Sequence, residues 1–325
     1  MNEKKKEVSQ SRFNIWASTF RTELTMGGVL ILLIIVLRLI SPNFLTTRNM
    51  TNILSQVSFT AILSLGQTFV LLTGGIDLSV GSVLGITSMV GAMLMKNTNS
   101  IFLAVIVTLL LGILIGSING TLVSLCGIPA FVVTLGMMQI CRSADYLLSG
   151  GHAVNKLPDA FRTIAGVEVA KGLRVYYLFI VVLFIFIHWV LNNTKLGRYT
   201  YGIGSNETAT RLAGVNTKLY KMLPYIISGF LAALGGLLMA SRFGAVDPNY
   251  GDGYEMNTLA AVVIGGTAMT GGKGTILGTA IGVLFMGVLS NGLDITGVSP
   301  YWQGVATGTV LILALLFDRF ANRKR

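Results

Sequence analysis

The stretch Gly265–Thr275, GGTAMTGGKGT, is the first candidate for chemistry, because five glycines and one lysine stand within eleven residues. A P-loop needs glycine, four spacers, glycine, lysine, then serine or threonine, so that backbone N–H groups wrap phosphates and a hydroxyl holds magnesium. Here Thr267 stands where the first glycine is required, and Gly274 where the hydroxyl is required. The spacing excludes a P-loop and predicts a backbone bend, with no nucleotide or other cofactor on this chain.

Ionisable side chains within apolar runs are few. Arg142 and Asp145 are three residues apart and share a helix face, which predicts an internal salt bridge near the outer end of their helix. Asp77 has two interpretations, as a cap of the helix that follows it or as part of a transport path. His152 and His188 have no second ligand at metal spacing, and no catalytic triad or dyad is recognisable, so neither a metal site nor an enzyme is expected.

Composition places these residues in a membrane. Of the 325 residues 53% are hydrophobic and 11% are charged, whereas soluble domains carry about 25% charged residues. The mean hydropathy is +0.72. The net charge of +11 comes from basic residues that stand between apolar runs rather than in one patch, which argues against a nucleic-acid partner. Cys126 and Cys141 lie in or beside apolar runs and are interpreted as small buried hydrophobes, not as a disulfide.

The apolar runs predict an all-α polytopic membrane protein with about ten transmembrane helices. No cleavable signal peptide is expected, because the first 23 residues are polar and the next run is long enough to span. The predicted organisation is a cytoplasmic segment 1–23, a permease domain 24–317 and a basic cytoplasmic tail 318–325. The spans are Leu24–Ile40, Ile53–Thr73, Leu78–Met95, Ile101–Cys126, Ala130–Leu148, Val175–Leu191, Met222–Ala240, Thr258–Thr270, Thr275–Gly292 and Tyr301–Phe317. The eighth of these spans, Thr258–Thr270, is short.

Basic residues orient the spans. With the N-terminus inside and ten alternating spans, fifteen lysines and arginines fall inside, seven fall outside and two lie within spans. Positively charged loops stay in the cytoplasm, so both ends of the chain and the segment 192–221 are predicted to be cytoplasmic. Nine or eleven spans would place one basic end outside.

The sequence also contains an internal echo. SPNFLTTRNMTNIL from Ser41 resembles DPNYGDGYEMNTL from Asp247, with the proline and the methionine each recurring after 206 residues. GSVLG from Gly81 aligns with GTILG from Gly274, 193 residues later. The pattern predicts that spans one to four match spans seven to ten in a parallel repeat, shortened in the second copy.

The two halves of this repeat each contain a glycine-interrupted junction, Gly74–Gly85 and Gly265–Gly278. Such paired interruptions are the sequence signal for a transport site at the middle of the membrane, and glycine can adopt the backbone angles that break a helix. The residues predicted to break helices or line the path are Gly74, Gly75, Asp77, Ser79, Gly81, Gly265, Gly266, Gly271, Gly272 and Lys273.

The predicted cytoplasmic segment from Asn192 to Lys221 has helical signals of its own. Asn206 is a good N-cap for a short helix that ends at Leu212, and Gly214 stops it. A short amphipathic helix on this face fits a groove of a partner, although a plain surface loop is the alternative. Glu207 and Arg211 are four residues apart and can pair along one face.

Three motifs resemble the ribose-type permease subunits of bacterial ATP-binding-cassette (ABC) sugar importers, and the resemblance spans about Ser41 to Phe317. The motifs are GIDLSVGS from Gly75, LGRYTYGIGSNETATRLAGVNT from Leu196 and GYEMNTLAAVVIGGTAMTGGKGTILGT from Gly253. The resemblance implies a bacterial inner-membrane importer with a cytoplasmic ATPase that uses the ATP, an extracytoplasmic sugar-binding protein and a second permease copy, identical or closely related. Asn257 departs from the family's usual acidic or apolar residue.

The resemblance also implies which residues couple to the ATPase, because the matching segment of the family is the coupling segment. These residues are Gly204, Asn206, Glu207, Ala209, Thr210, Arg211, Leu212, Gly214 and Asn216. The expected substrate is a monosaccharide, and a pentose such as ribose is the first candidate. The alternatives are another sugar or autoinducer-2 and, from another class of protein, an uncoupled channel or an ion-coupled carrier. An ion-coupled carrier usually needs buried carboxylates or histidines for its ion, and this sequence offers few.

Overall fold

A computed structural model describes residues 21–170 and 172–323. Helices dominate this part of the chain, and its strands are two or three residues long. The helices are α2 (Arg21–Ile40), α3 (Thr47–Leu72), α4 (Val80–Thr98), α5 (Ile101–Ser124), α6 (Ala130–Ser149), α7 (Asp159–Gly166), α8 (Val175–Asn193), α9 (Lys195–Leu212), α10 (Thr217–Phe243), α11 (Tyr254–Ile264), α12 (Ile276–Ile295) and α13 (Pro300–Arg323). The strands are β1 (Val154–Asn155), β2 (Glu168–Ala170), β3 (Leu173–Arg174) and β4 (Ala245–Val246).

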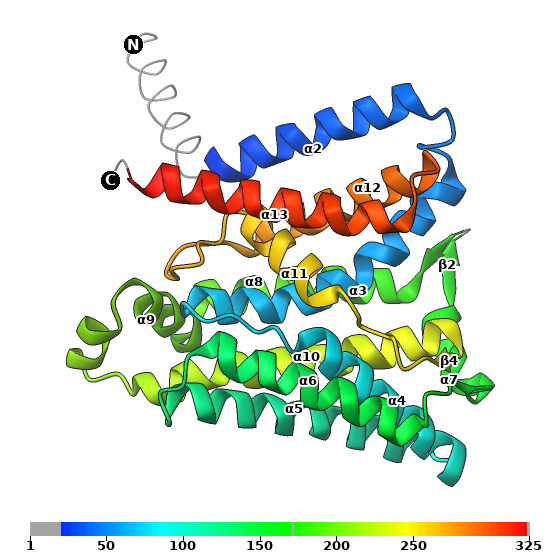
Figure 1. The fold of residues 1–325 in the computed structure, drawn as a ribbon, viewed down its shortest axis with the longest axis horizontal. Helices are drawn as coiled ribbons and strands as arrows, with labels where there is room; N and C mark the ends of the chain where they lie inside the picture. The colour runs from blue at the N-terminus through cyan, green and yellow to red at the C-terminus, as the bar shows by residue number, and fades with distance from the viewer. Residues whose placement is uncertain (1–20, 171, 324–325) are drawn as a thin grey trace, which may run out of the picture.

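The long helices are stacked between two ends of the molecule. Helices α2, α12 and α13 form one side, α4, α5, α6 and α10 form the other, and α3, α8 and α11 lie between them (Figure 1). Helix α9 lies at one end, where α2 begins and α13 ends. The opposite end carries α7 and the antiparallel pairs β1–β4 and β2–β3. Helix α3 joins the two sides, because it packs on both α10 and α12.

Small residues allow a close helix contact between α5 and α10. A Cβ atom added to Gly116 would lie 3.0 Å from the Cα of Ile226, and one added to Gly229 would lie 3.1 Å from the Cα of Gly116. The two backbones therefore touch without side chains between them. This is the packing that glycine permits in membranes, where close van der Waals contact drives helix association.

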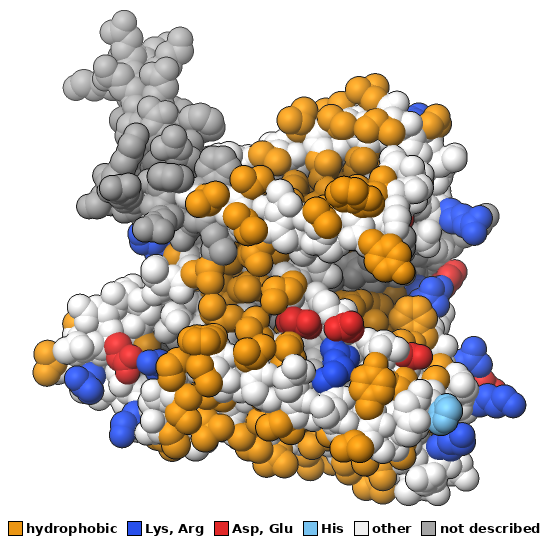
Figure 2. Space-filling model, in the orientation of Figure 1, with side chains coloured by type: hydrophobic (Ala, Val, Ile, Leu, Met, Phe, Trp, Pro, Cys, Tyr) orange, Lys and Arg blue, Asp and Glu red, His pale blue; other side chains and the backbone are white. Residues whose placement is uncertain are grey.

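The outer surface of the helices is apolar. Leu39 on α2, Phe102 on α5 and Leu147 on α6 are each more than three-quarters exposed. Figure 2 shows hydrophobic side chains in broad bands, with most of the charged ones gathered toward the two ends. Among the described residues, six helices are long and apolar enough to cross a membrane. The chain is therefore a multi-pass membrane protein, as predicted, and exposed leucines on these helices face lipid rather than water.

Each of the ten predicted spans falls on a helix, but the eighth was wrong in its second half. Helix α11 has 11 residues and ends at Ile264, and the residues up to Thr270 form turns. Eleven helical residues rise about 16 Å, about half of the 30 Å hydrocarbon core. The number of full crossings therefore stays a prediction. Gly265 and Gly266 end the helix early. The length of the apolar run, from which the span was predicted, does not reveal this end.

The ends of the predicted domains differ from the structure or lie outside it. Residues 1–20 of the predicted segment 1–23 and residues 324–325 of the predicted tail lie outside the described residues. Helix α13 continues to Arg323, so the described part of the tail extends that helix. Both cysteines are free, as predicted, but only Cys141 is buried. Cys126 is exposed, because α5 ends at Ser124, two residues before it.

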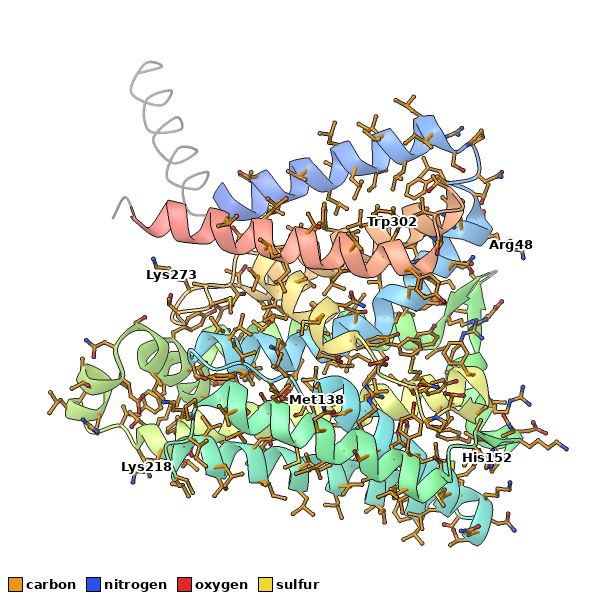
Figure 3. The ribbon with its side chains drawn as sticks, viewed as in Figure 1. Arg48, Met138, His152, Lys218, Lys273 and Trp302 are labelled. Atoms are coloured by element: carbon orange, nitrogen blue, oxygen red, sulfur yellow. The ribbon has the colours of Figure 1, made fainter. Side chains whose placement is uncertain are left out.

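The basic residues are sorted between the two ends. Lys218 and Lys273 lie at the end that carries α9, whereas Arg48 lies at the other end with His152, and Met138 is near the middle (Figure 3). This arrangement agrees with the predicted division of the basic loops between the two sides of the membrane, with Lys218 and Lys273 on one side and Arg48 on the other. Which end faces the cytoplasm stays a prediction.

Helix lengths agree with the predicted repeat for two pairs of helices but not for α2 and α10, which have 20 and 27 residues, so the repeat stays a prediction. Helices α4 and α5 have 19 and 24 residues, and their predicted counterparts α12 and α13 have 20 and 24. Helix α3 has 26 residues and its counterpart α11 has 11, so the second copy is shortened between the two landmarks.

Candidate functional site

The segment predicted to couple forms an angled projection, which we call the elbow (residues 195–216). It is helical from Lys195, earlier than the short helix predicted from sequence, and it bends at Asn206, whose φ of −161° and ψ of 98° are not helical. The Asn206 side chain accepts a hydrogen bond from the Ala209 backbone N–H at 2.9 Å. This confirms the predicted N-cap, because the side-chain oxygen satisfies a free N–H group at the start of a helix.

The second turn of the elbow also ends where the sequence predicts. The Thr210 hydroxyl donates to the Asn206 carbonyl at 2.9 Å, and the helix ends at Leu212. Gly214 has a φ of +85°, a left-handed conformation that favours glycine. Asn216 then caps α10 by accepting from the Leu219 N–H at 3.2 Å. Local hydrogen bonds therefore set the shape of the elbow.

The predicted pair between Glu207 and Arg211 is wrong. The Glu207 carboxylate lies 2.8 Å from the Lys221 ammonium on α10, which ties the tip of the elbow to the next helix. Arg211, Ala209 and Leu212 are exposed, and Leu212 is 82% exposed. This leucine lies at the α9 end rather than on a lipid-facing band, so it offers an apolar contact at a polar surface.

Three segments distant in sequence meet beneath the elbow in a glycine cluster, which we define as Gly74, Gly204, Gly271 and Gly272. The Gly272 N–H donates to the Leu72 carbonyl at 2.9 Å. A Cβ atom added to Gly271 would lie 2.7 Å from the Gly74 nitrogen and 2.9 Å from the Gly204 Cα. One added to Gly204 would collide with the Leu72 carbonyl oxygen. The elbow therefore rests directly on the backbone of both predicted junctions.

The glycine-rich loop Gly265–Thr275 is part of this contact. Its backbone closes on itself through the Ala268 N–H, which donates to the Lys273 carbonyl at 2.9 Å. Tyr201 of the elbow donates its hydroxyl to the Gly274 carbonyl at 2.8 Å. The glycines thus form the predicted bend, and the bend supports the elbow. Lys273 lies at the same end (Figure 3).

Asp77 is the centre of a separate buried cluster. Its carboxylate accepts from the Ser79 N–H at 2.9 Å and the Ser79 hydroxyl at 2.6 Å, and from the Ser228 hydroxyl at 2.8 Å. The Asn119 amide donates to the Ser79 hydroxyl at 2.9 Å. Ser79 itself is the residue before α4. These bonds join the start of α4 to α5 and α10, which favours the structural interpretation of Asp77 over the path.

The remaining predicted path residues lie in different places. Gly75 packs against the Tyr225 hydroxyl, and Gly81 packs within α4 against the carbonyl of Gly251. Gly265 contacts the backbone of Gly278 on α12. Gly266 supplies a turn with a φ of +90°. The structure therefore brings only part of the predicted set together, in the glycine cluster, and the others serve local packing.

The predicted salt bridge between Arg142 and Asp145 is wrong. Arg142 donates to the Tyr250 carbonyl at 3.0 Å and pairs with Asp252 at 3.6 Å. Asp145 is fully buried, and its carboxylate has no hydrogen-bond partner among the described residues. Helix spacing alone did not show that the loop before α11 folds back onto α6 and takes the arginine.

Sequence reasoning missed a polar cavity of about 460 Å³ between α3, α10, α11 and α12. Its polar lining is Asn49, Asn52, Ser55, Gln56, Asn291 and Asp294. Phe59, Phe243, Tyr254 and Arg242 supply an aromatic and basic part. A signal was present, because residues 49, 52, 56 and 59 recur at helical spacing on one face of α3. The predicted span began only at Ile53, so the polar face went unnoticed.

Comparisons with known proteins agree with this architecture. Residues 49–315 match the family model described as branched-chain amino acid transport system / permease component. The ribose import permease protein of Haemophilus influenzae is 39% identical over 91% of this chain and 93% of its own length. The ribose import permease protein of Escherichia coli K12 is 40% identical over 91% and 92%.

A relative named for a different sugar also matches. The galactose/methyl galactoside import permease protein of Escherichia coli K12 is 34% identical over 94% of this chain and 98% of its own length. No solved structure matches the chain significantly.

Proposed function

The chain belongs to the family of branched-chain amino acid transport system permease components, and from this premise we propose that it is the membrane subunit of an ABC importer for a monosaccharide. The observation that carries the proposal is the similarity to ribose import permeases over nine-tenths of both chains. Ribose is the first substrate to test. The galactose relative supports another sugar as the alternative, and autoinducer-2 is a further one.

The elbow supports the view that energy enters from a separate ATPase. A capped helical turn with an exposed leucine is suited to a groove of a partner protein. It rests on the glycine cluster, which contacts the C-terminal end of α3 and includes part of the loop before α12. An uncoupled channel has no use for such a projection. In this proposal ATP is hydrolysed on the partner, so the permease itself carries no nucleotide and is no enzyme.

The other partners follow from the same proposal. A second permease copy, identical or closely related, completes the path. An extracytoplasmic binding protein delivers the sugar at the end that carries α7 and the two strand pairs. The protein sits in the bacterial inner membrane with ten crossings, the eighth formed by α11 together with the loop that precedes it. Both ends of the chain and the elbow are cytoplasmic.

Uptake tests the substrate directly. A strain that lacks its own ribose and galactose importers receives this permease with its ATPase and binding protein, and accumulation of labelled sugars is measured. ATP-dependent uptake of ribose, above galactose, is the expected result. Uptake that survives an ATPase variant unable to hydrolyse ATP would support the channel or ion-coupled carrier instead.

Thiol labelling tests the orientation. In a Cys126→Ser background, Thr208→Cys marks the elbow and Asp159→Cys marks α7, where the aspartate side chain is 93% exposed. We expect an impermeant maleimide to label only Asp159→Cys in intact cells and both variants after lysis. Labelling of Thr208→Cys in intact cells would reverse the proposed topology.

A further inference from the structure

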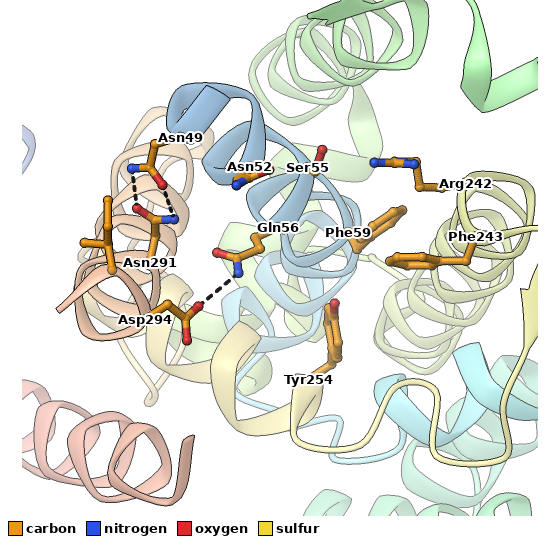
Figure 4. Close-up of a pocket in the computed structure, with 11 residues that line it drawn as sticks. Asn49, Asn52, Ser55, Gln56, Phe59, Arg242, Phe243, Tyr254, Asn291 and Asp294 are labelled. Carbon is orange, nitrogen blue, oxygen red and sulfur yellow. Dashed lines mark hydrogen bonds between the residues drawn. The ribbon is translucent and has the colours of Figure 1, made fainter. Parts of the chain in front are cut away.

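The polar cavity has a fixed wall on one side. Asn49 on α3 and Asn291 on α12 exchange two hydrogen bonds, at 2.7 and 3.0 Å, and both side chains are buried (Figure 4). The Asn49 amide also donates to the Phe44 carbonyl at 2.8 Å. These two amides are occupied with each other, so they hold the two helices at a set separation and leave ligand contacts to their neighbours.

Other polar groups in the cavity remain available. The Asn52 side chain lines the cavity, is exposed and makes no hydrogen bond within the described residues. Gln56 donates once, to Asp294 at 3.3 Å, which leaves its carbonyl and a second N–H. The Nε atom of Arg242 is buried and has no hydrogen-bond partner in the described part of the chain. An amide offers donors and acceptors together, and a guanidinium offers donors only.

The opposite side of the cavity is aromatic. In Figure 4, Phe243 and Tyr254 reach toward α3, where Phe59 stands. The rings of Phe59 and Phe243 are 6.2 Å apart between centroids, and Phe243 is 53% exposed. The Arg242 guanidinium lies 5.9 Å from the centre of the Phe243 ring. Apolar ring faces thus stand opposite amides across a space of about 460 Å³, within the range of small-molecule sites, about 300–1,000 Å³.

We propose that the polar cavity is a binding subsite for the transported monosaccharide within the permease, an inference that rests on the proposed function. A sugar ring has an apolar C–H face that suits an aromatic ring and a rim of hydroxyls, each of which donates and accepts. Asp294 already accepts from the amides of Gln56 and Gln303, so its charge is partly satisfied before a ligand arrives. The lining therefore suits a neutral polyhydroxyl ligand better than an amino acid, whose ammonium group would need an unoccupied carboxylate.

Substrate protection of a thiol tests occupancy. Asn52→Cys, in the Cys126→Ser background, is labelled with a maleimide in the reconstituted permease–ATPase complex, with ribose, galactose or leucine at equal osmolarity. We expect either sugar to slow labelling at least about twofold, as half-occupancy requires by mass action, and leucine to leave it unchanged. Equal protection by leucine, no protection by either sugar, or a thiol that never reacts would overturn the proposal.

Uptake tests whether the subsite matters for transport. Asn52→Ala and Gln56→Ala each remove hydrogen bonds to an uncharged ligand, so uptake is expected to fall about threefold to tenfold. Thr51→Ala is the matched control, because Thr51 lies on the same turn of α3, its hydroxyl donates only to the Arg48 carbonyl, and it does not line the cavity. Membrane abundance and ATPase co-purification are measured for each variant.

The two proposals fail differently. A wild-type complex that takes up sugar, with Asn52→Ala and Gln56→Ala transporting at its rate, would overturn the subsite alone. A wild-type complex that takes up no monosaccharide in an assay where the Escherichia coli ribose permease complex does would overturn the proposed function and the subsite with it.

Discussion

The elbow and the polar cavity occupy different regions of the molecule and are built in opposite ways. The glycine cluster under the elbow is backbone against backbone, with no space for a Cβ atom on Gly204 or Gly271. The cavity is a space edged by side chains from four helices, several of them with unused hydrogen-bonding groups. A contact between backbones suits the transmission of force, whereas projecting side chains suit the recognition of a small ligand.

This difference predicts unequal tolerance to substitution. A side chain in the glycine cluster has to displace a main chain, while a side chain in the cavity can change with little movement of its helix. Substitutions in the two regions therefore test whether they differ in this way.

Gly204→Leu and Gly271→Leu are expected to have the largest effect. Overpacking costs about 1–3 kcal/mol, and the left-handed backbone of Gly271, with a φ of +85°, adds about 1–2 kcal/mol. Both variants should lose uptake and lower the midpoint of thermal unfolding in detergent.

Gly136→Leu is the control for these variants. Gly136 lies within α6, and a Cβ atom added there would have no neighbour within 4 Å. If Gly136→Leu and Gly204→Leu lowered the unfolding midpoint equally, close packing in the glycine cluster would have no special importance.

Asn49→Leu tests the wall of the cavity. It leaves the Asn291 amide buried without its partner, which costs about 1–3 kcal/mol. The double variant Asn49→Leu with Asn291→Leu removes both amides and should recover part of that stability, because only the Phe44 carbonyl, which Asn49 also holds, then lacks its partner. Thermal unfolding in detergent measures both variants. A double variant less stable than either single variant would show that the mutual bonds of the two amides do not decide the stability of this wall.

Asn206→Ala should have a smaller effect than the variants above, because it weakens only the helical turn at the tip of the elbow. Loss of an N-cap costs about 1 kcal/mol, which corresponds to about a fivefold weaker affinity for the ATPase if the turn must be helical to dock. Titration of the ATPase onto the detergent-solubilised permease measures this, with Asn206→Asp as the conservative variant that keeps a capping oxygen. An affinity unchanged in Asn206→Ala would mean that docking does not require the capped turn.

Glu207→Gln should have the smallest effect. The Glu207 side chain is 42% exposed and its partner Lys221 is 28% exposed, so solvent screens the ion pair and its contribution is about 0.2–1 kcal/mol. Uptake at physiological salt should fall less than twofold, and raising the salt concentration should bring wild type and variant closer together. A tenfold loss would mean that Glu207 contacts the ATPase itself.

The sequence was a good guide where a signal is local. Asn206 and Gly214 are read from capping and stop signals, because the partner of the Asn206 side chain and the turn at Gly214 are local. The cap that Asn216 forms on α10 was not predicted. The positions of the membrane helices follow from apolar length. The junctions were also recognised by their glycines, because α3 ends at Leu72 and α11 ends at Ile264, just before them. Gly74 and Gly271 meet under the elbow, and a path along the junctions stays a prediction.

Long-range partners could not be predicted. Arg142 was assigned to Asp145, three residues away, whereas its carboxylate partner is Asp252, more than a hundred residues further on. Glu207 likewise pairs with Lys221 rather than with its helical neighbour Arg211. The cavity depends on how four helices pack, and no spacing within one helix contains that information.

The central claim is that energy enters this transporter at the elbow, and the most direct measurement combines ATPase co-purification with uptake in Leu212→Asp. A leucine that becomes buried in a groove of the ATPase contributes about 1.5–3 kcal/mol to the affinity. An aspartate at the same position would bury an unpaired charge when the two proteins dock. The ATPase is expected to separate from the Leu212→Asp permease and uptake to stop, while Glu207→Gln retains both and sugar binding by the binding protein is unchanged. An ATPase that stays bound to Leu212→Asp at the wild-type level, with uptake continuing, would contradict the account.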